Sequence, residues 1–277
     1  MSICRARCLL AAALAALLAG CSASRDSPSR PVPQVVPEIL RELPHDTLAF
    51  TQGLLYDGGK LYESTGAPGG RVSSLRVVNP ASGAVSGIQP VPDVFAEGIA
   101  VLGEQLVQLT WRNGIAFVYS FPALRRTDEV FEYGGEGWGL ASDGRQFYMS
   151  DGSDTLRVLD AAFGLRKKLP VRMAGRPVRS LNELECARGR LYANIWYSAI
   201  IVEIDPRSGA VTRTIDCAQL QRRAAPASID DVLNGIAYNP ARDVFFLTGK
   251  NWRVMFEVRI PAETAGTPSR APTAPGQ

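Results

Sequence analysis

Residues 181–218 read LNELECARGRLYANIWYSAIIVEIDPRSGAVTRTIDCA, and this stretch decides the fold. It contains four short runs rich in Val, Ile and Tyr, with turn sequences at 187–189 and 206–209. Short β-branched and aromatic runs that alternate with Gly, Pro and Ser are typical of antiparallel strands joined by tight turns. The stretch therefore predicts one four-stranded sheet.

The same arrangement recurs along the chain. A polar or aromatic residue leads into Gly, or an equivalent position, and then into an apolar strand followed by a second strand. These openings are Gln52-Gly53, Glu97-Gly98, Trp138-Gly139, Asn182-Glu183 and Asn234-Gly235. Their spacing of about 40 to 50 residues is the period of a propeller blade. Helical periodicity is weak except at 217–223. The sequence thus predicts an all-β fold, a single-domain five-bladed β-propeller over residues 39–260.

A propeller closes its ring, usually by pairing segments from the two ends of the chain in one blade. The run EILRELPH (38–45) precedes blade one, and MFEVRIP (255–261) ends blade five. We expect these two segments to pair in blade five.

The N-terminus, MSICRARCLLAAALAALLAGCSAS (1–24), has two arginines ahead of an apolar run of about a dozen residues, shorter than the roughly 20 that span a bilayer. It predicts a signal peptide at 1–20. Leu18–Cys21 resembles a bacterial lipoprotein processing site, with the Cys21 thiol as the lipidation site, although an ordinary secretory signal with a chance cysteine is the alternative. Lipidation predicts a protein of the bacterial cell envelope that faces the periplasm and contacts the membrane through its lipid anchor only.

The segments on either side of the propeller are rich in Pro, Ser and Arg, and they predict a tether at 21–38 and a disordered tail at 261–277. The net charge of +3 comes without a basic and aromatic stripe, which argues against nucleic acid as a partner. Cys186 and Cys217 are expected in an oxidising compartment that permits a disulfide. However, one follows an inner strand and the other an outer strand, which can separate them beyond bonding reach.

Antiparallel pairing places the start of the first strand and the end of the second strand of each blade at the same rim. The residues expected at this mouth are Gln52, Thr65, Glu97, Trp111, Trp138, Asp151, Asn182, Trp196, Asn234 and Lys250. They include three of the four tryptophans of the chain. The indoles would line a small apolar pocket, although each tryptophan alone could instead pack between blades.

Glu97 follows Phe95 and is expected among the indoles. Desolvation there would raise the pKa of its carboxyl group, which suits a group that moves protons near neutral pH. Lys250 would oppose this rise and could orient a carbonyl oxygen. The alternatives are that Glu97 and Glu136 cap strand ends and that Lys250 is a solvated surface group.

The chain has one histidine, His45. No serine at the predicted mouth is framed as an exposed nucleophile for a Ser/His/Asp triad, and a zinc site with His and Cys ligands is excluded by the same scarcity. His45-Asp46 is expected to be a structural or rim hydrogen-bonding pair.

Nine motifs carry a resemblance to a known family: FTQGL (50–54), FAEGI (95–99), LTW (109–111), GEGWGL (135–140), SDGS (150–153), LNELE (181–185), ANIW (193–196), LNGIAY (233–238) and TGKNW (248–252). In order and spacing they resemble the glutamine cyclotransferases of the plant and bacterial type. The resemblance implies a five-bladed propeller without cofactor or metal. It also implies a glutaminyl-peptide cyclotransferase, an acyltransferase that acts on peptides or proteins with N-terminal Gln, forming pyroglutamyl ends and releasing ammonia.

The resemblance also implies roles for individual residues. Glu97 corresponds to the proton-transfer residue of the family, Gln52 and Asn182 to substrate-binding amides, and Lys250 to the lysine of the TGK motif. We expect Asn182 or Lys250 to join Glu97 in catalysis by holding the carbonyl oxygen as it becomes an oxyanion. The other substrate-binding positions are Phe50, Phe95, Trp111, Trp138, Trp196 and Asn234. Ala100 and Arg253 depart from the usual pattern beside the motifs, which bears on the shape of the rim rather than on the chemistry.

Two other functions are compatible with a propeller. A lactonase-like hydrolase would use Glu97, Asn182 and Asn234 to bind a divalent cation that activates water. The indoles and Lys250 argue against that site. A non-enzymatic binding propeller of the cell envelope would not need a carboxylate at the mouth.

Overall fold

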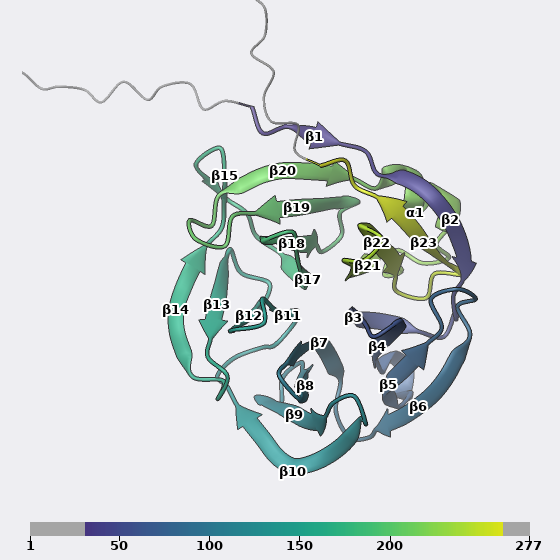
Figure 1. Ribbon diagram of the computed structural model, residues 1–277, viewed down its shortest axis with the longest axis vertical. Coiled ribbons are helices and arrows are strands. Elements are labelled where there is room, and N and C mark those ends of the chain that lie inside the picture. The colour runs from purple at the N-terminus through teal and green to yellow at the C-terminus, as the bar shows by residue number, and fades with distance from the viewer. Residues whose placement is uncertain (1–30, 263–277) are drawn as a thin grey trace, which may run out of the picture.

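The computed structural model describes residues 31–262, and their strands form five sheets around a central axis (Figure 1). The predicted all-β, five-bladed propeller is confirmed. The expected signal peptide, the lipidation site Cys21 and all but the first two residues of the expected tail lie outside the described residues. Among the described residues, no helix is long and apolar enough to cross a membrane.

Each blade contains four antiparallel strands. Blade one consists of β3 (Phe50–Asp57), β4 (Lys60–Gly66), β5 (Ser73–Val78) and β6 (Val85–Val91). Blade two consists of β7 (Ala96–Leu102), β8 (Gln105–Thr110), β9 (Ile115–Ser120) and β10 (Arg125–Glu132). Blade three consists of β11 (Leu140–Ser142), β12 (Phe147–Met149), β13 (Thr155–Leu159) and β14 (Leu165–Pro170). Blade four consists of β17 (Leu181–Ala187), β18 (Arg190–Ile195), β19 (Ile200–Ile204) and β20 (Val211–Asp216). Blade five consists of β21 (Leu233–Asn239), β22 (Val244–Gly249), β23 (Val254–Arg259) and β2 (Glu38–Pro44).

A 3-10 turn, a helix and a two-stranded hairpin lie between the strands of the blades. The 3-10 turn η1 (Pro68–Gly70) follows β4, and α1 (Ala218–Ala224) precedes blade five, close to the helical turn expected at 217–223. The strands β15 (Arg172–Met173) and β16 (Arg176–Pro177) form a hairpin between blades three and four.

The ring closes in blade five, as predicted. The N-terminal strand β2 pairs antiparallel with β23, from Glu38 opposite Arg259 to Pro44 opposite Val254. One boundary was wrong: the propeller begins before residue 39, because β1 (Gln34–Val35) pairs in parallel with β20 on the outer edge of blade four. The expected tether at 21–38 therefore includes residues that belong to the fold.

The innermost strands approach one another through their backbones near the axis. A Cβ atom on Gly98 would lie 2.5 Å from the backbone nitrogen of Leu140, and one on Gly139 would lie 2.1 Å from the carbonyl oxygen of Asn182. These contacts leave no room for a side chain, which explains why the repeat requires glycine there. The close approach holds Glu97 and Trp138, the residues that precede these glycines, at the mouth near the axis.

Glu183 takes the place of glycine in blade four. Its side chain is buried, and its two carboxylate oxygens accept the backbone N–H groups of Leu54 in β3 (3.2 Å) and Ile236 in β21 (2.9 Å). Burial raises the pKa of Glu183, and the two N–H donors oppose that rise. Glu183 thus ties blades one, four and five together at the axis.

The two cysteines of the described region are free, so Cys186 and Cys217 form no disulfide in this structure. Cys217 is fully buried in a hydrophobic cluster with Leu220 and Trp252 between blades four and five. This is the cluster on which α1 packs through Leu220 and Ala224.

His45 is buried and structural, but its partner differs from the one expected. Its Nδ1 donates to the carbonyl oxygen of Trp252 (2.7 Å) and its Nε2 to Oε1 of Glu63 (2.8 Å), while Asp46 pairs with Arg76 (2.7 Å). Burial opposes the charge on His45, but Glu63 outweighs it and the pKa of His45 is raised above 6.5. Burial likewise opposes the charge on Glu63, but His45 and Thr51 outweigh it and the pKa of Glu63 is lowered below 4.5.

These opposite pKa shifts predict the pH dependence of stability. Because the pKa of His45 is raised in the folded state, protonated His45 stabilises the fold. This contribution is complete below pH 6.5 and is lost as the pH rises through the folded-state pKa. Because the pKa of Glu63 is lowered in the folded state, its ionised carboxylate stabilises the fold. This contribution is complete above pH 4.5 and is lost as the pH falls through the folded-state pKa. We expect the His45–Glu63 pair to contribute most to the free energy of unfolding between pH 4.5 and pH 6.5. Outside this range about 1.4 kcal/mol is lost for each unit by which a pKa is shifted. Urea unfolding of the parent and of His45→Gln/Glu63→Gln from pH 5 to pH 9 checks this, and equal slopes for the two proteins would contradict it.

Candidate active site

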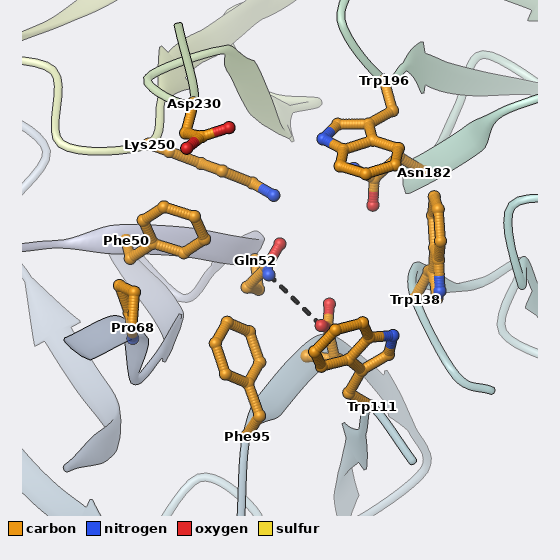
Figure 2. Close-up of a pocket in the computed structure, with 11 residues that line it drawn as sticks. Phe50, Gln52, Pro68, Phe95, Trp111, Trp138, Asn182, Trp196, Asp230 and Lys250 are labelled. Atoms are coloured by element: carbon orange, nitrogen blue, oxygen red, sulfur yellow. Dashed lines mark hydrogen bonds between the residues drawn. The ribbon is translucent and has the colours of Figure 1, made fainter. Parts of the chain in front are cut away.

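A cavity of about 220 Å³ opens at the mouth of the propeller (Figure 2). Its walls are formed by Phe50, Gln52, Pro68, Phe95, Glu97, Trp111, Trp138, Asn182, Trp196, Asp230 and Lys250. Nine of the ten residues predicted for catalysis or substrate binding are in this set, and Asn234 is the exception. Residues from all five blades therefore line this one cavity.

The floor of the cavity carries a short chain of hydrogen bonds. The side-chain nitrogen of Gln52 donates to Oε1 of Glu97 (3.2 Å; Figure 2), and the side-chain nitrogen of Asn234 donates to Oε1 of Gln52 (3.3 Å) and to the carbonyl oxygen of Thr51 (2.9 Å). Asn234 thus lies behind Gln52 rather than on the wall. Its N–H group fixes which end of the Gln52 amide faces Glu97.

Glu97 is 4% exposed, and burial raises the pKa of its carboxyl group well above the ordinary value. Lys250 opposes this rise and Glu136 adds to it. The pKa of Lys250, which is also buried, is lowered by burial against the opposing effect of Glu97. Burial therefore pushes both groups toward their neutral forms, in which each can exchange a proton with a bound molecule near neutral pH.

Aromatic rings enclose the space above this floor. The ring centroids of Phe50 and Phe95 lie 6.0 Å apart, those of Phe95 and Trp111 5.6 Å, and those of Trp138 and Trp196 5.2 Å, all edge to face. Figure 2 shows these rings on opposite sides of the cavity, with the Lys250 ammonium between them. Its Nζ lies 4.7 Å from the centroid of the Phe50 ring. The wall fits a compact uncharged group and excludes most water.

Glu136 holds two of the indoles in place. One of its carboxylate oxygens accepts the indole N–H groups of both Trp111 (2.8 Å) and Trp138 (2.9 Å), and the other accepts the guanidinium of Arg112 (2.9 Å). Arg112 also stacks on the Trp111 ring at 3.7 Å from its centroid. The sequence predicts no more for Glu136 than a cap on a strand end, because no local pattern shows that two tryptophans from different loops share one acceptor.

We expect Glu136→Ala to raise KM by about five- to tenfold with little loss of stability. The variant leaves two indole N–H groups without an acceptor, and a typical hydrogen bond to a charged group is worth about 1.5–3 kcal/mol, reduced here because Glu136 is partly exposed. Arg112→Ala is the matched control, since it removes the outer ion pair and the stacking on Trp111 but keeps both indole bonds. KM values for a Gln-initiated peptide decide the point, and an equal rise in both variants would contradict the positioning role.

Two of the other positions expected at the mouth do not reach the cavity. Thr65 bonds to Ser74 within blade one (2.7 Å), and Asp151 pairs with Arg157 (2.9 Å). Conversely, Pro68 and Asp230 line the cavity although the repeat did not point to them. Both lie in loops between strands, where the blade period predicts nothing.

The loop that carries Asp230 is well anchored. Asp231 accepts the backbone N–H groups of Ala227 (3.1 Å) and Ser228 (2.8 Å), and its carbonyl oxygen accepts the indole N–H of Trp252 (2.8 Å). The adjacent Asp230 accepts the hydroxyl of Tyr197 (2.5 Å) from the loop of blade four. Asp230 is thereby held at the rim beside Lys250 (Figure 2).

The donor set at the mouth is poor in metal ligands. Within residues 31–262, no three His, Cys, Asp or Glu side chains gather where they could hold a metal ion. Of the groups assigned to the lactonase-like alternative, Asn234 donates both of its hydrogen bonds inward and does not line the cavity.

A closed propeller whose mouth holds a buried carboxyl group, amides and a lysine under an aromatic wall is typical of an enzyme that encloses a small side chain. A model of the glutamine cyclotransferase family matches residues 12–260. The glutaminyl-peptide cyclotransferase of Arabidopsis thaliana is 38% identical over 234 residues, 82% of this chain and 72% of that protein. The crystal structure of Myxococcus xanthus glutaminyl cyclase is 41% identical, with a TM-score of 0.78, and the match covers 83% of this chain and 98% of that one. The chain belongs to the glutamine cyclotransferase family, and it is an enzyme of the transferase class.

Proposed function

We propose that the protein converts N-terminal glutaminyl residues of peptides or proteins to pyroglutamyl residues, with release of ammonia and with Glu97 as the proton carrier. The observation that carries the proposal is the pairing of Gln52 with a buried Glu97, of raised pKa, on the floor of an aromatic cavity. The family supports the reaction, and the cavity suits its substrate, because a glutamine side chain is compact and uncharged.

The reaction is intramolecular, so positioning supplies much of the rate. The α-amine and the side-chain carboxamide belong to one residue, and ring closure needs only that the flexible side chain fold back on itself. Effective molarities in well-oriented intramolecular reactions reach about 10⁵–10⁸ M. We assign this positioning to the aromatic wall, which restricts the bound side chain to a folded conformation.

One proton must change place during the reaction. The α-amine attacks the carboxamide carbon, a C–N bond forms, and the amine nitrogen gives up a proton. The bond to the amide nitrogen then breaks, and that nitrogen must leave as ammonia rather than as an amide ion. Glu97 gives a proton to the leaving nitrogen and takes one from the attacking nitrogen, so no water is consumed and the carboxyl group returns to its starting state. The amine must be neutral to attack, which favours a pH near its ordinary pKa of about 7.7–8.0.

Charge also develops on the carboxamide oxygen as the amine attacks. Asn182 and Lys250 lie on the cavity wall with their polar groups toward its centre (Figure 2). We assign to them the hydrogen bonds that stabilise this oxygen, since donors held in a dry site cost no reorganisation when the charge forms. Gln52, held by Asn234, keeps Glu97 oriented during the proton transfer.

A single assay tests the reaction against the lactonase-like alternative. Ammonia release from a Gln-initiated peptide is measured with and without a strong chelator, and lactone hydrolysis is measured in parallel. We expect ammonia release that the chelator leaves unchanged. Loss of activity that added metal restores would favour the hydrolase, and no activity on either substrate would favour a binding propeller.

We further propose that the enzyme is a lipoprotein of the cell envelope, anchored at Cys21 and facing the periplasm. The motif at 18–21 supports this proposal. Cys21→Ser in the full-length precursor removes the thiol that takes the lipid, so we expect the membrane-bound, processed form to disappear. Detergent phase separation of cell extracts measures this, and recovery of the variant in the detergent phase at parental levels would contradict it.

A further inference from the structure

The outer edge of the propeller between blades three and four carries an unusual concentration of positive charge. Six exposed basic residues, the basic edge, lie on β14, on the β15–β16 hairpin and just after it: Arg166, Lys167, Lys168, Arg172, Arg176 and Arg179. Residues 161–182 contain no aspartate or glutamate. Of the six, only Arg166 forms an ion pair with an acidic side chain of the described region, Asp160 (2.9 Å). The other five make no ion pair within residues 31–262, although Arg172 donates to the carbonyl oxygen of Gly175 (3.2 Å). Their charges can therefore meet an external anion.

The β15–β16 hairpin adds an apolar tip to this edge. Its turn residues Ala174 and Gly175 both have positive φ (49° and 80°), as in the tight two-residue turns that favour glycine. Arg172 and Arg176 flank Met173, whose side chain is 38% exposed. All six residues from 172 to 177 are exposed, so the hairpin contributes nothing to the core beyond its base. A two-stranded hairpin is only marginally stable by itself, which makes core stability a poor explanation for it.

The hairpin lies where the chain enters the described fold. The backbone nitrogen of Arg172 bonds to the carbonyl oxygen of Gly209 (3.0 Å), just before β20, and β20 is the strand with which β1 pairs. Val32 and Val178 pack against the same hydrophobic cluster. Figure 1 shows β15 at the rim of the propeller, beside the start of β20 and near β1.

This position relates the basic edge to the proposed lipid anchor. Nine residues lie between Cys21 and Pro31, the first described residue, and these ten residue-to-residue steps span at most about 35 Å when fully extended. An anchor at Cys21 would hold this edge nearer the bilayer than the opposite side of the propeller. Exposed arginine and lysine gain about 1 kcal/mol each, a factor of about five in binding, beside an anionic lipid surface. Their apolar stems and an exposed methionine also suit the boundary between headgroups and acyl chains.

We propose that the basic edge is a docking surface for an anionic phospholipid bilayer, with the tip of the β15–β16 hairpin at the headgroups. It adds a second membrane contact to the anchor and fixes how the propeller is oriented. This proposal rests on the proposed anchor at Cys21 but not on the cyclisation chemistry. The catalytic cavity opens at the mouth, near the axis, so docking through the outer edge leaves the cavity accessible to peptides.

Vesicle sedimentation tests the proposal with the chain from Ser22 to Gln277, which keeps every strand of the propeller and lacks any lipid. We expect binding to vesicles that contain phosphatidylglycerol, none to pure phosphatidylcholine, and a steep fall with added salt. Arg172→Ala/Arg176→Ala should weaken binding about 25-fold, at about fivefold for each charge. Arg125→Ala/Arg145→Ala, which removes two exposed arginines outside the basic edge, is the control for net charge and should have a much smaller effect.

Two further measurements test the apolar contact with the lipid and the folding of the variants. Met173→Ser should lower the binding that persists at high salt, because that binding depends on contact with the lipid rather than on charge. Ammonia release by every variant should match the parent, which separates a docking defect from misfolding. Unchanged binding of the hairpin variant, or an equal loss in the control, would overturn the proposal. Binding to DNA or to a second copy of the chain but not to phosphatidylglycerol vesicles would also overturn it.

Discussion

Replacing Glu97 with Gln is expected to lower kcat by about 10²- to 10⁴-fold, the range that general acid and base catalysis typically contributes. The amide keeps the shape of the side chain and can still bond to Gln52, but it cannot carry a proton between the two nitrogens. Because burial disfavours the charge on Glu97, the substitution should leave the unfolding midpoint unchanged or raise it. Steady-state kinetics on a Gln-initiated peptide, with thermal unfolding alongside, measures both effects.

Glu136→Gln is the matched control for this prediction, since it makes the same chemical change at a carboxylate that contacts the indoles but does not line the cavity. We expect kcat of this variant to stay within a few-fold of the parent. A Glu97→Gln enzyme that turns over at a comparable rate would remove Glu97 from the role of proton carrier. An equal collapse in both variants would show that the aromatic wall, not proton transfer, limits the rate.

Trp252→Ala is expected to destabilise the fold by about 3–5 kcal/mol, the usual cost of truncating a fully buried large aromatic residue. Trp252 is 0% exposed, and its indole N–H bonds to the carbonyl oxygen of Asp231. Trp138→Ala should behave in the opposite way, with KM raised about tenfold or more and only a small change in stability. Trp138 lines the cavity edge to face with Trp196, and its ring faces the space that the substrate would fill.

Unfolding midpoints and KM values for the two variants separate these roles. Trp111→Ala and Trp196→Ala extend the series, because both indoles also line the cavity. If the three cavity variants unfold easily yet bind the peptide normally when folded, these residues serve the core rather than the pocket. A stable Trp252→Ala protein would contradict the packing described for blade five.

The fold was predictable because its signal is periodic. Each blade repeats a polar or aromatic residue, a glycine and two apolar runs, except that Glu183 replaces the glycine in blade four. Backbone contacts at the axis require the glycines at positions such as Gly98 and Gly139. The closure of the ring in blade five was predictable because residues 38–45 resemble a strand but precede the first repeat of the sequence. The pairing of β1 with blade four could not be predicted, because a two-residue strand in a segment rich in proline gives no strand signal.

Seven of the residues that line the cavity were predictable because antiparallel pairing brings the ends of successive strands to one rim. Phe50 and Phe95 were expected only from the family resemblance. Features that depend on side chains far apart in the sequence were missed. Glu63 rather than Asp46 pairs with His45, because a buried carboxylate in β4 outcompetes one that is held at the surface by Arg76. Asn234 was placed on the wall, but its donors turn inward to Thr51 and Gln52. Asp230 reaches the rim only through a loop anchored by Asp231, and no spacing in the sequence encodes that contact.

The most direct test of the central claim is mass analysis of a Gln-initiated peptide after incubation with the purified enzyme. The account predicts that the peptide loses one ammonia at its N-terminal residue. An Nα-acetylated copy, whose nitrogen cannot attack, should stay unchanged, and Glu97→Gln should abolish the conversion on the same time scale. Loss of ammonia from the acetylated peptide, or hydrolysis to N-terminal glutamate instead of ring closure, would contradict it.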